Sequence, residues 1–271
     1  MRKISQNHLP KNLQYDDIIE RFLVDTQTDN FDSYRDTLIT AASHFNSKIS
    51  IPISLHEISQ NKGQYSDIVK YYTDTLVNGD LRIVYDIIRA SSSRCPHCSS
   101  SKVTCLDHYL PKEKFPLLAI YPKNLIPTCK DCNEAKGTYA SSNYDTLLLN
   151  PYYDEIYSLK WISARITDYD PINIEFFVIE NPIYKDEFKR VDTHFKKLKL
   201  QDTFQSSAND EISGILWHLK KLLSESDSSS VSAHLLDCAK SWEDNNINSW
   251  QRALYECLGN DSYFCNEYLT K

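Results

Sequence analysis

The chain has 271 residues, of which 41% are hydrophobic and 25% are charged, and its formal net charge is −7. This composition is typical of a soluble globular protein with one large domain or two modest ones, and no apolar run of about 18 residues predicts a membrane span. The acidic balance disfavours a protein that coats nucleic acid through bulk charge. It leaves a nuclease open, because a nuclease needs only a local basic surface and a cation. The first residues, MRKISQNHLPKNLQYDD, lack the apolar core of a signal peptide, so we expect a cytoplasmic protein.

Residues 1–90 are predicted to form a helical region, because apolar side chains recur there at steps of three and four. Gly79 is predicted to end one helix and Asp80 to cap the next. The segment 47–63 is ambiguous, since KISIPISLHEI could be extended while Pro52 disfavours a central strand. Three sets of apolar residues carry the helical pattern: Phe31, Tyr34, Leu38, Ala41 and Phe45; Tyr65, Ile68, Val69, Tyr72 and Leu76; and Leu81, Val84, Tyr85 and Ile88.

Residues 91–150 are predicted to form a separate module built around two Cys-x-x-Cys motifs. The motifs are Cys95/Cys98 and Cys129/Cys132, and five of the eight cysteines lie in this part of the chain. A tight turn aims both sulfurs of such a motif at one ion, and two motifs supply the four thiolates of a tetrahedral structural zinc site. A redox dithiol is the alternative for either motif taken alone. We expect the remaining one, Cys105, to pack in a strand.

The sequence between and after the cysteine pairs carries a resemblance. It reads LDHYLPKEKFPLLAIYPKNLIPTC and then, after the last cysteine, NEAKG. The order Cys-x-x-Cys, Asp-His-x-x-Pro, Asn-Leu-x-Pro-x-Cys-x-x-Cys-Asn-x-x-Lys resembles the zinc-containing HNH endonucleases of the ββα-metal class. The resemblance implies a strand that ends in Asp-His, a second strand, and a short helix that closes over a divalent ion.

The candidate site residues follow from this order. An unperturbed histidine can take a proton from water near neutral pH, so His108 is the candidate general base. Asp107 offers the oxygen ligand that Mg²⁺ or Mn²⁺ prefers, and the resemblance makes Asn133, where the family commonly has His, the second ligand of this catalytic ion. Asn124 matches the middle Asn of the family and is expected to hold the loop that orients His108. Lys136, one helical turn after Asn133, is expected to contact substrate phosphate or to cap the helix.

Each of these residues also has an ordinary structural interpretation. Asp107 could be a surface acid and His108 a buried histidine with satisfied hydrogen bonds, while Asn124 and Asn133 could be turn or cap residues. Taken singly, each residue favours the ordinary interpretation. Their order between two cysteine pairs favours an active site.

Residues 151–271 are predicted to contain a strand pair followed by helices. SLKWISARI and INIEFFVIE alternate in polarity on either side of the turn DYDP. Helical periodicity returns over 184–223, SESDSSSVS (224–232) is predicted to be a polar linker, and two further helices follow. The lysine-rich stretch 185–199 is interpreted either as a solvated helix face or as a local basic surface. The predicted fold is α+β and mainly helical, with a central ββα-metal HNH module and a structural zinc held by four cysteines, flanked by helical segments.

The wider chain resembles a group of bacterial HNH proteins, through YDIIRASSSRCPHC, NPYYDEIYSLKW and RVDTHFKKLKL. Some members of that group are nucleases of anti-phage systems, such as the Septu type, that act beside an ATPase. The resemblance implies a hydrolase that cuts phosphodiester bonds in DNA, with RNA not excluded, and a partner ATPase; self-association is left open. The alternative from another class is a non-catalytic zinc module that binds nucleic acid or protein.

Overall fold

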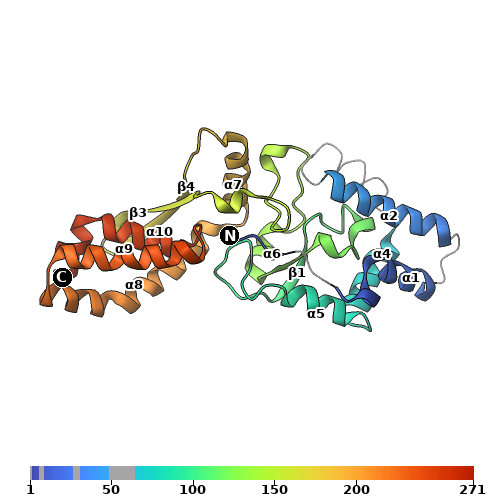
Figure 1. Cartoon of the computed structure of the whole chain (residues 1–271), viewed down its shortest axis with the longest axis horizontal. Helices are drawn as coiled ribbons and strands as arrows, with labels where there is room; N and C mark the ends of the chain where they lie inside the picture. The colour runs from blue at the N-terminus through green and yellow to red at the C-terminus, as the bar shows by residue number, and fades with distance from the viewer. Residues whose placement is uncertain (1, 6–8, 27–30, 49–64) are drawn as a thin grey trace. The chain divides into compact units, whose positions relative to one another are not determined.

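The computed structural model describes residues 2–5, 9–26, 31–48 and 65–271, so most of the ambiguous segment 47–63 lies outside the described residues. Within the described residues the chain is mainly helical and has two small antiparallel sheets, which confirms the α+β, mainly helical prediction (Figure 1). The chain divides into two compact units, one made mainly of residues 3–154 and the other mainly of residues 155–271. No helix of this described part combines the length and the apolar character needed to cross a membrane.

Among the described side chains, the helices of the first unit bury most of the apolar residues that carry the predicted pattern. Leu38 and Phe45 of the second helix, Ile68 of the next and Ile88 of the last are all fully buried. Burying each such side chain contributes on the order of 2 kcal/mol. The helices are α1 (Tyr15–Asp25), α2 (Phe31–Lys48), α4 (Ser66–Tyr71), a π-helical segment (Tyr72–Val77) and α5 (Arg82–Ala90).

The chain between α4 and α5 turns tightly at Gly79. A Cβ at this position would lie 2.5 Å from the carbonyl oxygen of Asp74, so only glycine fits the turn. The prediction that Asp80 caps α5 is wrong. The helix begins after Leu81 without a side-chain cap, and the Asp80 carboxylate instead accepts a hydrogen bond from Arg21 of α1 at 3.1 Å.

A short antiparallel strand pair and a helix follow α5. Strand β1 (Cys105–His108) pairs with β2 (Leu125–Thr128), so that Asp107 lies opposite Ile126 and His108 opposite Leu125. A sheet of two strands has only edges, and this is why Pro127 is tolerated inside β2. Helix α6 (Lys130–Lys136) starts directly after β2 and ends at Gly137, whose φ of 52° lies in the left-handed region that ends many helices.

The second unit pairs a strand ribbon with long helices. Strands β3 (Ile162–Tyr169) and β4 (Ile172–Val178) are antiparallel, which confirms the predicted strand pair, and Ile174 and Phe176 alternate into the core as expected. Helix α10 packs against β3, α8 packs against β4, and α9 packs against α10 (Figure 1). The helices are α7 (Lys185–Lys197), α8 (Leu200–Glu225), α9 (Ser228–Asn245) and α10 (Trp250–Asn260).

The predicted polar linker 224–232 is wrong for most of its length. Helix α8 runs to Glu225 and α9 starts at Ser228, so only two residues separate them. The Asp227 carboxylate accepts a hydrogen bond from the backbone N–H of Ser230 at 2.8 Å and caps α9. A run of serines therefore forms the exposed first turn of a helix, where polarity alone had indicated a loop.

Candidate functional site

Four buried cysteines form a cluster in the part of the chain that the sequence marks as the zinc module. Cys95, Cys98, Cys129 and Cys132 place their Sγ atoms within 4.8 Å of one another, and no other group of three or more potential ligands meets this spacing in the described residues. Tetrahedral zinc with Zn–S bonds of about 2.3 Å separates its sulfurs by about 3.8 Å. The cluster therefore fits zinc after a small contraction, and the four cysteines could hold this ion.

Local backbone structure aims these sulfurs. Cys95 donates its N–H to the carbonyl of Ser101 at 2.9 Å, and Ser99 between them adopts a positive φ of 57°, which closes a tight turn. In the second motif, Cys129 caps α6, because its Sγ accepts from the backbone N–H of Cys132 at 3.5 Å. A sulfur that caps a helix lies near the positive end of the helix, and this position favours the thiolate form that zinc requires.

Asp107 is buried beside a lysine. Its Oδ1 lies 3.0 Å from Nζ of Lys136, which also donates to the backbone carbonyl of His108 at 2.6 Å. Side-chain exposure is 7% for Asp107 and 2% for Lys136. Burial raises the pKa of Asp107 to about 6, and the ammonium of Lys136 acts in the opposite direction. The predicted phosphate contact of Lys136 stays a prediction; in this structure its ammonium compensates the charge of Asp107.

His108, the last residue of β1, has a defined tautomer. Its Nε2 lies 2.9 Å from the carbonyl oxygen of Ala119. A carbonyl only accepts, so Nε2 carries the proton and Nδ1 keeps its lone pair in the neutral ring. Burial lowers the pKa of His108 to about 3, so the ring is neutral at physiological pH. This tautomer is the one that a general base acting through Nδ1 requires.

Asn124 makes the loop hydrogen bonds that the sequence predicts for it. The side-chain Oδ1 accepts from the N–H of Leu110 at 2.8 Å, and Nδ2 donates to the carbonyls of Leu110 and Leu118 at 3.0 and 3.1 Å. The backbone carbonyl of Asn124 also accepts from Tyr109. Asn124 thus fastens both ends of the loop 109–118, which leads from His108 to its hydrogen-bond partner Ala119.

Asn133 lies on the face of α6 that packs against β1. Its Nδ2 is 3.7 Å from Sγ of Cys105, while Lys136, one turn later, reaches Asp107. Cys105 and Asp107 are two residues apart on β1 and share one face of the strand. The structure therefore brings Lys136 directly to Asp107 and to the backbone of His108. Asn124 holds the loop that follows His108, and Asn133 contacts Cys105, two residues before Asp107.

Two tyrosines from the N-terminal helices also contact β1, and no sequence pattern indicates these contacts. The hydroxyl of Tyr85 accepts the N–H of Leu106 at 3.2 Å. The ring of Tyr72 packs edge-on against the imidazole of His108, with centroids 4.5 Å apart and an interplanar angle of 68°. Helical periodicity marks both tyrosines as buried, but it cannot name the residues that they face.

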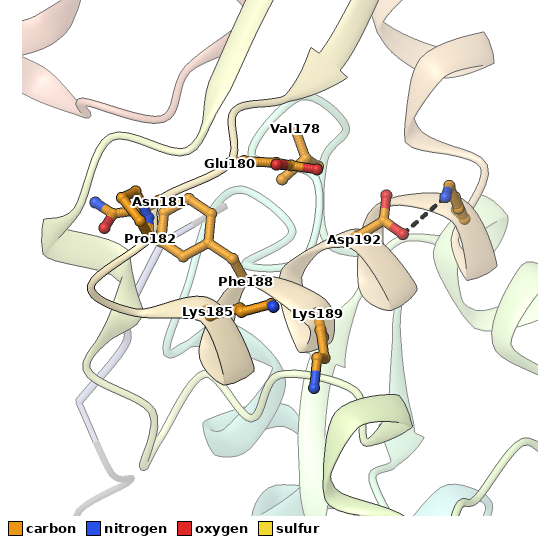
Figure 2. A pocket seen from close by; sticks show the side chains of 9 residues that line it. Val178, Glu180, Asn181, Pro182, Lys185, Phe188, Lys189 and Asp192 are labelled. Atoms are coloured by element: carbon orange, nitrogen blue, oxygen red, sulfur yellow. Dashed lines mark hydrogen bonds and ion pairs between the residues drawn. The ribbon is translucent and has the colours of Figure 1, made fainter.

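A pocket of about 880 Å³ lies in the second unit, at the β4–α7 loop (Figure 2). Two of its three lysines have acidic partners: Lys196 donates to Asp192 at 2.7 Å, the dashed line in Figure 2, and Lys189 donates to Asp186 at 2.9 Å. No predicted site residue lines it. The lining residues are Val178, Glu180, Asn181, Pro182, Lys185, Phe188, Lys189, Asp192 and Lys196.

Comparison with known proteins gives two curated relatives. Protein ea31 of Escherichia phage lambda is 26% identical over 203 residues, which cover 69% of this chain and 69% of that protein. Septu protein PtuB of Bacillus thuringiensis is 34% identical over 73 residues, which cover 25% of this chain and 28% of PtuB. No protein-family model matches the chain, and no solved structure matches it. The chain is thus a partial homologue of a Septu protein and has a cysteine cluster that could bind zinc.

Proposed function

We propose that the chain is a metal-dependent HNH endonuclease that hydrolyses phosphodiester bonds in DNA. One observation carries the proposal: a histidine with an unprotonated Nδ1 adjoins a carboxylate at the end of a strand, and a helix that starts in the cysteine cluster contacts this carboxylate. The strand, strand and helix order agrees with the resemblance in the sequence. The partial similarity to Septu protein PtuB further supports a defence-related nuclease.

The proposed chemistry assigns one task to each group. His108 removes a proton from water at Nδ1, and the water oxygen attacks phosphorus while the bond to the leaving oxygen breaks. The carboxylate of Asp107 and the side-chain oxygen of Asn133 are hard donors that fit Mg²⁺ or Mn²⁺, which supplies positive charge at the phosphate when it is bound. Lys136 donates to Oδ1 of Asp107, so the carboxylate would hold the cation beside this ion pair. Asn124 keeps the loop that carries the partner of His108 in place.

The same similarity supports a biological context as part of this proposal. The chain would act as the nuclease effector of a bacterial anti-phage system, together with a partner ATPase. Its net charge of −7 is consistent with a protein that reaches DNA through such a partner.

Plasmid cleavage tests the proposal. Purified protein, alone and with its neighbouring gene product, is incubated with plasmid and Mg²⁺ or Mn²⁺, beside the variants His108→Ala and Asp107→Ala. We expect His108→Ala to lose at least about 100-fold in cutting rate, because general-base catalysis contributes about 10²–10⁴-fold. Asp107→Ala is expected to lose cutting because it removes the proposed cation ligand, and its folding is measured in parallel because it leaves the buried Lys136 unpaired. Asp131→Ala, which removes an exposed acid on α6, is the matched control and is expected to cut like the wild type. Equal cutting by wild type and His108→Ala would contradict the assignment.

A second candidate function is a non-catalytic zinc module for binding nucleic acid or protein. The burial of the ion pair between Asp107 and Lys136 favours it, because paired, buried charges often serve structure. The same plasmid assay separates the two functions. Binding of DNA or protein without cutting by any form, under either metal and with the partner present, would favour the binding module.

A further inference from the structure

The ring of Tyr72 is the closest aromatic neighbour of the candidate base among the ring contacts of the described residues. Tyr72 and His108 are 6% and 7% exposed, and their rings meet edge-on at 4.5 Å. Edge-to-face packing at this distance is directional and stabilises one relative orientation of the two rings. Tyr72 therefore restrains the plane of the imidazole, and the hydrogen bond to Ala119 restrains its edge.

Tyr72 reaches His108 at a change in helix type. It is the first residue of the π-helical segment that continues α4, and such segments are frequent at functional sites. Its neighbour Tyr71 points elsewhere: the hydroxyl of Tyr71 donates to Asp25 of α1 at 2.8 Å, and its ring packs against Phe22. Consecutive tyrosines thus link the helix to α1 on one side and to β1 on the other.

The Tyr72 hydroxyl lies near residues of the candidate site, including Asp107. Burial and the nearby Tyr85, Asp107 and Cys105 raise its pKa, while Arg82 lowers it. The hydroxyl therefore stays un-ionised at physiological pH. What Tyr72 contributes to His108 is its ring.

We infer that Tyr72 is a positioning residue for His108 in the hydrolysis proposed above, on which this inference rests. The imidazole turns about its Cβ–Cγ bond, and because this axis passes closer to Nε2 than to Nδ1, the hydrogen bond from Nε2 alone restrains Nδ1 only weakly. The Tyr72 ring blocks the rotation and holds Nδ1 toward one direction. A base that is misplaced by about 1 Å can cost about 100-fold in rate.

Kinetics of three variants test the inference. Tyr72→Phe keeps the ring and is expected to retain kcat within about twofold. Tyr72→Leu removes the ring contact and is expected to lower kcat at least about tenfold with little change in KM, because orientation and not substrate binding is lost. Tyr71→Leu is the matched control, since it removes an equally buried tyrosine from the same helix. It is expected to lower stability but to leave kcat of the folded protein within about twofold.

A second measurement, by NMR, reports the tautomer and the order of the His108 imidazole directly. In protein labelled with ¹⁵N-histidine, and with His108 assigned through His108→Gln, we expect the single Nε2–H tautomer in the wild type and in Tyr72→Phe. In Tyr72→Leu we expect averaged or doubled signals. A wild-type kcat for Tyr72→Leu, or an unchanged His108 spectrum, would overturn the inference, as would Tyr72→Phe behaving like Tyr72→Leu. If the wild type cuts no substrate, the proposed function fails, and the spectra alone decide whether Tyr72 orients His108.

Discussion

At the scale of single residues, burial shifts the pKa values of the adjacent Asp107 and His108 in opposite directions. Burial disfavours the charged form of each group, so the pKa of the carboxyl rises to about 6 and that of the imidazole falls to about 3. Between these values both groups are neutral. Above pH 6 the carboxylate is ionised, as a metal ligand must be, and the imidazole is unprotonated, as a base must be, although its lowered pKa makes it a weaker base than a free histidine.

This order of pKa values predicts the acidic limb of the activity profile. Cutting is expected to rise from pH 5 to pH 7 with a midpoint near 6, because Asp107 must lose its proton to hold the cation, while His108 is already neutral throughout this range. Proton and cation compete for one carboxylate, so a higher Mg²⁺ concentration is expected to move the midpoint to lower pH. Rate profiles at two Mg²⁺ concentrations measure this shift.

The control for that profile is Asp131→Asn, which alters an exposed acid of the same helix and is expected to leave the midpoint in place. A midpoint that does not depend on Mg²⁺ would show that Asp107 is not the group that controls the limb.

At the scale of elements, helix α6 turns one lysine into the core and another to solvent. Lys136 pairs with Asp107 at 2% and 7% exposure, whereas Lys130 pairs with Glu134 at 76% and 66%. Exposed pairs contribute about 0–1 kcal/mol, while removal of one partner from a buried pair costs about 3–5 kcal/mol because the other charge is left unpaired. Helix α6 therefore contains both a buried ion-paired lysine, Lys136, and an exposed one, Lys130, that serves as its control in a stability measurement.

Lys136→Met is accordingly expected to lower the free energy of unfolding by about 3 kcal/mol or more. Lys130→Met is expected to change it by less than about 0.5 kcal/mol. Adding Asp107→Asn to Lys136→Met is expected to restore part of the loss, since no uncompensated charge then remains buried. Urea unfolding of zinc-loaded protein gives all four values. Equal effects of the two lysine variants would contradict the structural role of the buried pair.

The elements also show what sequence patterns can predict. The strand pair near residues 162–178 and the long helices followed from hydrophobic periodicity, because burial on one face repeats with the geometry of the element. The structure of polar segments was harder to predict from the sequence. Asp80 and Asp227 have the same capping preference, yet only Asp227 caps a helix, whereas Asp80 accepts a hydrogen bond from the distant Arg21. Local sequence propensity contains no information about such a tertiary partner.

The residues of the candidate site also differ in whether local sequence patterns could predict their contacts. Motif order marked Asp107, His108 and Asn124, since their chemistry and spacing are visible in the chain. The pairing of Lys136 with Asp107 and the packing of Tyr72 on His108 connect residues that are about 30 positions apart, and no local pattern contains this information.

At the scale of the whole molecule, the cysteine cluster and the second unit differ in what stabilises them. The two cysteine pairs frame two strands of four residues and a helix of seven, elements too short to form a core among themselves although the rest of the unit buries most of their residues. The helices α8, α9 and α10 have their own core around Phe204, Leu235 and Leu254. Zinc is expected to matter for the first of these regions and much less for the second, because metal binding contributes folding free energy where the ligands are.

Removal of zinc should therefore unfold the molecule unevenly. Purified protein is expected to hold one zinc per chain, and a strong chelator or Cys132→Ser is expected to abolish amide-exchange protection in β1, β2 and α6 while protection persists in α8 and α10. Nuclease activity is expected to disappear together with the protection of β1, because Asp107 and His108 end that strand. Cys238→Ser changes a cysteine outside the cluster and is the matched control, with unchanged zinc content and protection. Full protection of β1 and α6 after complete loss of zinc would show that side-chain packing alone holds the site, and that the four thiolates do not clamp it.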